Sequence, residues 1–185
     1  MAWNTEETRR KLLAAATQHF ARSGLAGARI DAIARDAGVN KERIYQYFGD
    51  KAGLFASVLD VEIDRLLDGI EVSGQGADAL GNLAGDLHDR ALEHPHLPRL
   101  LLWESLELEE PVSPQSRSAG CARMVTAIGE AAPRLEGRSA AEILLSVIAI
   151  AFADSCLPHL TRLVTPGSCR ELRRAAVVQQ ASALA

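Results

Sequence analysis

The sequence has few cysteines, no leader segment and no apolar run long enough to mark a membrane protein. Its three cysteines, Cys121, Cys156 and Cys169, lack CxxC spacing, which favours free thiols in a reducing compartment over a disulfide framework. Cys121 and Cys156 are expected to be isolated buried thiols. The longest apolar run, from about Ile143 to Ala153, is too short to cross a bilayer. No positively charged stretch precedes an apolar one at the N-terminus. These absences predict a cytoplasmic protein without a membrane span.

Sequence motifs of catalysis are absent as well. The chain has no phosphate-binding loop, no G-x-S-x-G, no H-E-x-x-H and no Cys–His pairing motif. His94 and His96 flank Pro95, but no third ligand lies near them in the sequence, so solvated histidines are favoured over a metal site. The sequence therefore predicts no enzyme, no metal and no cofactor.

The composition favours a globular chain with a localised basic region. The chain has 185 residues, of which 48% are hydrophobic, enough to bury a core in one or two small domains. Its net charge of −4 argues against a protein that coats nucleic acid along its whole surface. Residues 1–51 carry nine basic and six acidic side chains, net +3, whereas residues 52–185 carry eleven and eighteen, net −7. A basic head on an acidic body suits a localised phosphate footprint.

Helical periodicity runs along the chain, and the alternation typical of strands is absent. Capping boxes at residues 4–7, 139–142 and 168–171 open helices, and segments rich in Gly or Pro separate them. The pattern predicts an all-α protein of about nine helices. They run over residues 4–24, 30–37, 40–48, 51 to about 70, 80–91, 97–109, 118–131, 139 to the turn at 165–167, and from 168 onward.

Residues 30–48 have the pattern of a helix-turn-helix. Gly38 suits the tight turn because only glycine freely adopts a positive φ. Ile44 and Phe48 occupy the inner face of the following helix. Its outer face is rich in hydrogen-bond donors and aromatic rings, a surface that suits the major groove of DNA. The outer residues are Lys41, Glu42, Arg43, Tyr45, Gln46 and Tyr47. A plain exposed helix can carry the same residue types, and by itself this pattern leaves that alternative open.

Short motifs follow one another from residue 33 to residue 54. They are Ile33-Ala34, Ala37-Gly38-Val39, Asn40-Lys41, Ile44-Tyr45-Gln46-Tyr47-Phe48 and Lys51-Ala52-Gly53-Leu54. In these residues the chain resembles the TetR family of repressors, and the helix count of the remainder fits the same plan. The resemblance implies a three-helix helix-turn-helix DNA-binding domain over residues 1–50. It also implies a helical effector-binding and dimerisation domain over residues 51–185.

The resemblance implies roles for single residues. Tyr45 and Tyr47 match positions that touch the DNA backbone, and Lys51 matches a lysine that binds phosphate at a helix N-terminus. The positions that match base-reading residues are Lys41, Glu42, Arg43 and Gln46. The guanidinium of Arg43 suits the O6 and N7 atoms of guanine.

Two departures from the family pattern concern the DNA interface. The family often has Thr or Ser before the second helix, where this chain has Ala28 and Arg29. Arg29 can supply a phosphate contact by its charge, but the helix cap is lost. Position 43 is usually small in the family, and Arg43 implies an unusual operator sequence.

The sequence of the C-terminal helices predicts dimerisation. The helix that begins at residue 139 is apolar nearly all round, so it has to be buried on more than one side. The last helix is rich in alanine, which permits close helix approach. The resemblance implies that these two helices pair with their twins in a four-helix interface; a buried central helix of a monomer is the alternative. The predicted interface residues are Leu144, Ile148, Phe152, Leu172 and Ala176.

The family also binds small molecules inside the C-terminal body. Glu104 and Asp154 lie on apolar faces, where an unpaired carboxylate is costly to bury, so they can bind a cationic effector. The alternative is that they pair with an arginine such as Arg123 or Arg162, or lie at an exposed edge. The predicted pocket residues are His88, Trp103, Glu104, Met124, Phe152 and Asp154.

Together these patterns predict a DNA-binding transcriptional regulator. Its partners are double-stranded DNA with a pseudo-palindromic operator, a second copy of the chain, and a small-molecule effector of unknown identity. A repressor released by the effector is the favoured reading. The alternative is a dimeric, ligand-binding helical protein with weakened or lost DNA binding.

Overall fold

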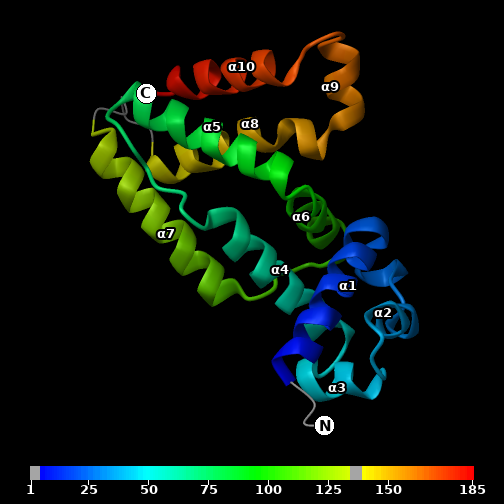
Figure 1. The fold of residues 1–185 in the computed structure, drawn as a ribbon. Coiled ribbons are helices and arrows are strands. Elements are labelled where there is room, and N and C mark those ends of the chain that lie inside the picture. Colours follow the sequence, from blue (N-terminus) through cyan, green and yellow to red (C-terminus); the bar gives the residue numbers. More distant parts are fainter. Residues whose placement is uncertain (1–4, 134–138) are drawn as a thin grey trace. The chain divides into compact units, whose positions relative to one another are not determined.

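The computed structural model describes residues 5–133 and 139–185, and these residues form ten α-helices and no strand (Figure 1). The predicted all-α class is therefore confirmed. Contacts divide the chain into two compact units, one of residues 1–65 and 96–113, the other of residues 66–95 and 114–185. This division differs from the functional boundary after residue 50, which stays a prediction. The capping box predicted at Asn4 falls on a residue outside those that the structure describes.

The first unit is built around the N-terminal helices. It contains α1 (Thr5–Gly27), α2 (Ile30–Ala37), α3 (Glu42–Phe48), most of α4 (Lys51–Leu67), and α6 (His96–Glu107). Its core joins residues from all five helices, and Phe20 meets Phe55 edge to face with their ring centroids 5.1 Å apart. Leu12, Ile33, Ile44 and Leu100 are fully buried in this core. The apolar positions that the helical periodicity marked therefore point inward.

The first helix is longer than the sequence predicted. It does not stop at Ser23-Gly24 but continues to Gly27 across a kink at Gly24, where φ is 69° and ψ is −177°. This backbone region is accessible almost only to glycine. The glycine that suggested a helix end instead bends the helix.

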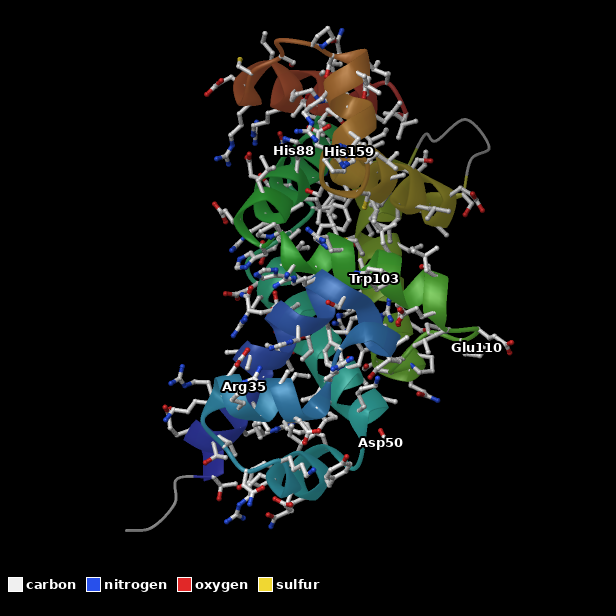
Figure 2. The ribbon with its side chains drawn as sticks, turned by 90° about the vertical axis from the view of Figure 1, so that its right-hand side faces the viewer. Arg35, Asp50, His88, Trp103, Glu110 and His159 are labelled. Carbon is white, nitrogen blue, oxygen red and sulfur yellow. The ribbon has the colours of Figure 1, made fainter. Side chains whose placement is uncertain are left out.

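The turns of the helix-turn-helix form as predicted. Gly38 ends α2 with φ 64° in the left-handed region, and its N–H donates to carbonyls of the last turn. Arg29 precedes α2 and makes no side-chain cap, which confirms the lost cap. Asp50, which is labelled in Figure 2, caps α4. Its Oδ1 accepts from the N–H of Gly53 at 2.7 Å. These ends hold α3 between two short, defined turns.

The second unit consists of the remaining helices. They are α5 (Ala77–Glu93), α7 (Pro114–Ala131), α8 (Ala140–Cys156), α9 (Pro158–Val164) and α10 (Arg170–Ser182). α5 packs on both α8 and α10. Gly85 permits the close approach to α10, because an added Cβ would lie 3.0 Å from Val178 Cγ2. Arg173 binds both carboxylate oxygens of Asp154 at 3.0 and 3.1 Å, which attaches α10 to α8.

The extra helix arises where the sequence predicted one continuous helix. α8 ends at Cys156, and α9 starts at Pro158 after a bend of 89°. Proline cannot donate to the preceding turn, but it fits the first position of a new helix. In the part of the chain that the structure describes, no single helix is long and apolar enough to span a membrane; α8 and α9 meet that criterion only when taken together.

The structure corrects several predicted helix ends and the predicted burial of the cysteines. α7 begins at Pro114 rather than Ser118, and α4 ends at Leu67 rather than near residue 70. α10 begins after Cys169, so the predicted box opened by Ser168 does not form. Cys121 is exposed and Cys156 is half-buried, so the prediction that both thiols are buried was wrong. The residues at which helices begin and end, and the burial of single side chains, depend on tertiary contacts that the sequence pattern does not show.

Candidate nucleic-acid interface

The outer face of α3 collects the polar residues that the sequence marked. Ile44 is fully buried on the opposite side, and Phe48 packs against the same core. Glu42 and Gln46 are exposed, and Tyr45 is 51% exposed. Since the inner face is occupied by the core, the outer side chains are available to a partner in solution.

Arg43 and Gln46 form a pair on this face. The Arg43 Nη1 atom donates to Gln46 Oε1 at 2.7 Å, one helical turn away. The pair holds the guanidinium across the helix surface, and the guanidinium has five N–H donors in all. The planar fork of a guanidinium suits the two acceptors on the major-groove edge of guanine.

Lys41 lies in the turn before α3 and already has a partner. Its Nζ lies 3.0 Å from Asp31 Oδ1 on α2. The hydrogen bond to the Asp31 carboxylate raises the pKa of Lys41 above its ordinary value, and the ion pair is exposed. Exposed pairs contribute little to stability, so the ammonium can exchange this carboxylate for another anion at small cost.

Lys51 opens α4 and reaches back to the end of α1. Its Nζ donates to Ala26 O at 3.2 Å and to Ala28 O at 3.3 Å. An ammonium has three N–H donors, so one remains for an anion. Arg29, one residue beyond Ala28, is exposed. The two predicted phosphate cations therefore flank the same stretch of backbone.

The aromatic residues at the end of α3 lie beside Arg9, which the sequence analysis did not predict to contact them. Tyr47 is half-buried, and its ring centroid lies 6.3 Å from that of Phe48. The guanidinium of Arg9 on α1 lies 5.5 Å from the Phe48 centroid. Nothing in the spacing of Arg9 and Phe48 predicts this contact, because it depends on how α1 crosses α3.

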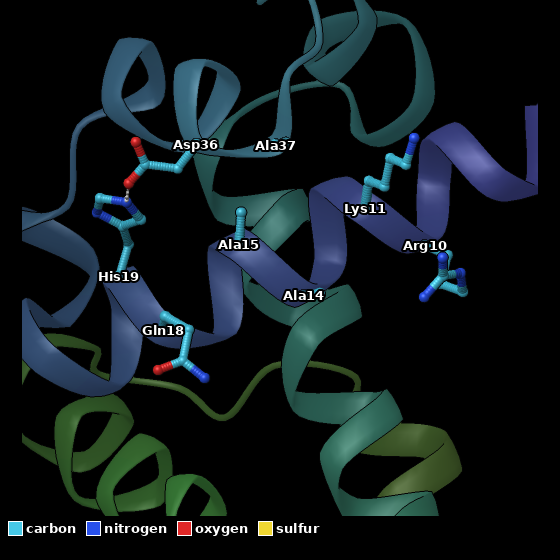
Figure 3. A pocket seen from close by; sticks show the side chains of 8 residues that line it. All are labelled: Arg10, Lys11, Ala14, Ala15, Gln18, His19, Asp36 and Ala37. Atoms are coloured by element: carbon cyan, nitrogen blue, oxygen red, sulfur yellow. Dashed lines mark hydrogen bonds and ion pairs between the residues drawn. The ribbon is translucent and has the colours of Figure 1, made fainter.

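An open groove of about 480 Å³ runs along α1 toward the end of α2 (Figure 3). At one end His19 Nε2 donates to Asp36 Oδ2 at 2.8 Å, and this bond lowers the pKa of Asp36 below its ordinary value. At the other end Arg10 and Lys11 both pair with Glu7, at 2.8 and 3.6 Å. The groove is thus lined by charges that are paired within the unit.

Comparison with known proteins gives this arrangement a family. Residues 12–58 match the family described as "Bacterial regulatory proteins, tetR family", and residues 79–182 match "Tetracyclin repressor-like, C-terminal domain". The chain is 34% identical over 171 residues to the HTH-type transcriptional repressor SCO4008 of Streptomyces coelicolor, covering 90% of this chain and 88% of the relative. The chain belongs to the TetR family.

Two further similarities fit this assignment. The TetR-family protein is similar to the crystal structure of the transcriptional regulator SCO4942 of Streptomyces coelicolor, with a TM-score of 0.80 and 31% identity over 96% of this chain and 97% of that one. It is also 33% identical over 113 residues to the HTH-type transcriptional repressor NicS of Pseudomonas putida, covering 57% of this chain and 51% of the relative. Members of the family bind DNA and respond to ligands, and dimerisation is typical of them.

In this TetR-family protein, the predicted effector-pocket residues divide between the two units. Trp103 and Glu104 belong to the first unit, and His88, Met124, Phe152 and Asp154 to the second. Trp103 Nε1 donates to Ala21 O at 3.4 Å, and the buried Glu104 accepts from the N–H of Val112 at 2.9 Å. Both side chains therefore have contacts inside their own unit.

The second unit contains a buried histidine with one ring nitrogen that makes no hydrogen bond within the part of the chain that the structure describes. His88 is buried, and its Nδ1 donates to Ala151 O at 3.2 Å. Its Nε2 is the one buried side-chain N or O atom without a hydrogen-bond partner among the described residues. Asp154, in contrast, shows the pairing alternative: its partner is Arg173 rather than Arg123 or Arg162. His88 is thus the predicted pocket residue with an acceptor left open.

The predicted dimer residues differ in how accessible they are. Leu144 and Phe152 are buried within the protomer, Ile148 and Ala176 are half-buried, and Leu172 is 64% exposed. Six of the large exposed aliphatic side chains lie on the last three helices or at the bend between α8 and α9. They are Leu145, Leu157, Leu160, Leu163, Val164 and Leu172. Leu145 was not among the predicted interface residues. When a helix is apolar all round, the sequence does not indicate which of its faces is exposed.

Proposed function

We propose that this TetR-family chain is a cytoplasmic, homodimeric repressor that binds a pseudo-palindromic operator and leaves it when a small-molecule effector binds. Residues 1–50 form the DNA-binding part, and residues 51–185 bind the effector and dimerise. Arg29, Tyr45, Tyr47 and Lys51 hold phosphates, and the outer face of α3 reads bases. The repressor names of the relatives SCO4008 and NicS support the direction of regulation.

The observation that supports this function best is the two-sided character of α3. Its inner side is closed by the buried Ile44, while Arg43 and Gln46 are paired on the outer side. A helix that projects donors from a rigid three-helix head is the form in which side chains reach base edges in the major groove. Cations at Arg29 and Lys51 then lie at helix ends, where phosphates are favoured.

A binding assay with the DNA that flanks its own coding region tests the function. We expect a salt-sensitive complex with two protomers per site, since phosphate contacts release counterions. A stable dimer that binds no flanking DNA at low salt would favour the alternative of a ligand-binding protein that has lost DNA binding.

The proposed effector contacts are the six predicted pocket residues. His88 Nε2 offers an acceptor to a donor group of the effector. A cation at Asp154 has to compete with Arg173, which already holds both carboxylate oxygens. A screen of lipophilic cations and neutral aromatics for release of operator DNA tests these contacts.

Arg43→Ala tests base reading. If Arg43 contacts a guanine, the substitution costs roughly 1–3 kcal/mol on the true operator and relaxes the preference at one base pair in each half-site. Affinities for operators varied one position at a time measure this effect. Arg35→Ala is the matched control, because Arg35 is an exposed arginine of α2 outside the proposed interface (Figure 2). A uniform loss across all operators would show that Arg43 touches phosphate only.

Lys51→Ala tests the phosphate contact. We expect weaker binding to every DNA sequence, because phosphates carry no sequence information. The slope of log affinity against log salt concentration should fall by about one unit. Titrations at several salt concentrations measure it. An unchanged slope together with altered sequence preference would contradict the assignment.

A further inference from the structure

The kink in α1 leaves a backbone donor that α6 takes up. Beyond Gly24, the N–H of Ala26 donates to the Glu107 carboxylate, with 2.9 Å between Ala26 N and Glu107 Oε2. Glu107 is the last residue of α6 and is half-buried. A hydrogen bond to an ionised carboxylate is stronger than one between neutral groups. The end of α6 is therefore anchored to the end of α1.

The rest of α6 follows the second half of α1. Gln18 Nε2 donates to His96 Nε2 at 3.0 Å, and Trp103 Nε1 donates to Ala21 O at 3.4 Å. With the Glu107 contact, the partners on α1 advance in the same order as the residues on α6. The Trp103 ring fills the space that Gly24 leaves, since an added Cβ would lie 2.7 Å from Trp103 Cε3. The kink and α6 are fitted to each other.

The same Ala26 is held from the other side by Lys51. Its carbonyl, like that of Ala28, accepts from Lys51 Nζ. The last turn of α1 and the residue that follows it are thus bound by a carboxylate of α6 and an ammonium of α4. Loss of the carboxylate frees the Ala26 backbone and with it one of the two carbonyls that orient the ammonium.

We infer that Glu107 is a positioning residue for DNA binding, which acts through Ala26 on Lys51 and on the start of α2. The inference rests on the proposed function, because Lys51 matters here as a phosphate ligand. The chain passes from the second unit into α6 at His96, and it returns to the second unit after Ser113. An effector that displaced α6 would therefore act on the DNA contact through Glu107.

Two substitutions at Glu107 separate positioning from charge. Glu107→Gln removes the charge but keeps an oxygen that accepts from Ala26 N–H, whereas Glu107→Ala removes both. We expect Glu107→Gln to bind operator like the wild type or slightly more tightly. Glu107→Ala should bind about tenfold more weakly, with a salt slope lower by about one unit. In a Lys51→Ala background the two substitutions should have the same effect.

Amide exchange provides a readout that does not involve DNA. The Ala26 N–H should be protected in the wild type and in Glu107→Gln, and should exchange faster in Glu107→Ala. Glu107→Asp, whose carboxylate is one methylene shorter, replaces Glu107→Ala if that variant fails to fold. Equal affinities and salt slopes for the alanine and glutamine variants would overturn this inference alone. Failure of the wild type to bind any flanking DNA would overturn the proposed function and this inference with it.

Discussion

Replacing Leu172 with glutamate is expected to dissociate the dimer and abolish tight binding to a two-fold operator. Leu172 lies on α10 with most of its surface exposed, so the glutamate stays solvated in the free protomer. In a dimer built on α8 and α10, two-fold symmetry places two such charges in one apolar interface. An unpaired buried carboxylate costs several kcal/mol, so the dimer dissociation constant should rise by roughly 1,000-fold or more. Sedimentation at micromolar concentrations measures it.

The same substitution at Leu106 is the matched control. Leu106 is 75% exposed but lies on α6 in the first unit, outside the proposed interface. Leu106→Glu should remain a dimer and bind operator normally. Ile148→Asp should also dissociate the dimer, but Ile148 is half-buried, so part of its effect comes from the protomer fold. Sedimentation of the wild type as a monomer, or equal behaviour of the two glutamate variants, would contradict dimerisation through this surface.

Gly24→Ala is expected to destabilise the first unit strongly. Its φ of 69° with ψ of −177° strains any residue with a Cβ by about 1–3 kcal/mol. The new methyl group would also overlap the Glu107 carboxylate and approach Trp103 Cε3 to 2.7 Å, and overpacking of this kind costs roughly 1–3 kcal/mol more. The thermal midpoint should fall by about 10 °C. Operator affinity should fall with it, because Gly24 precedes the segment that holds Lys51.

Gly129→Ala provides the comparison for this effect. Gly129 is an exposed residue inside α7, and nothing lies within 4 Å of an added Cβ. The substitution should leave the midpoint unchanged or raise stability by about 0.4–1 kcal/mol, since alanine favours the helix. Calorimetry of both variants measures the difference. A Gly24→Ala protein as stable as the wild type would show that the kink is not required by the fold.

The three N-terminal helices illustrate how much of the fold and of the candidate site could be predicted from the sequence. Gly38 and the buried Ile44 were predicted correctly because a turn and a helix face each depend on residues within about one helical turn. Gly24 was misread as a helix stop for the complementary reason. A glycine that ends a helix and a glycine that bends one look alike until a neighbouring helix, here α6, packs against the bend.

The site residues show the same limit. The sequence placed Arg43 and Gln46 on one face of a helix, and the structure joins them directly. It did not show that Asp31 pairs with Lys41, or that Arg173 rather than Arg123 or Arg162 neutralises Asp154. Ion pairs between helices depend on crossing geometry, for which composition and spacing provide no signal.

The sequence by itself determined the helical class, the helix-turn-helix and the face of α3 that is turned away from the core, because helical periodicity and turn residues act over a few neighbouring positions. Only the tertiary structure decided which backbone Lys51 and Glu107 share, although Ala26 and Glu107 lie 81 residues apart in the chain. It also decided that Leu172 is exposed while Leu144 is buried. Both outcomes depend on which helices pack together and at what angle, and this choice is made by the whole core rather than by any local pattern.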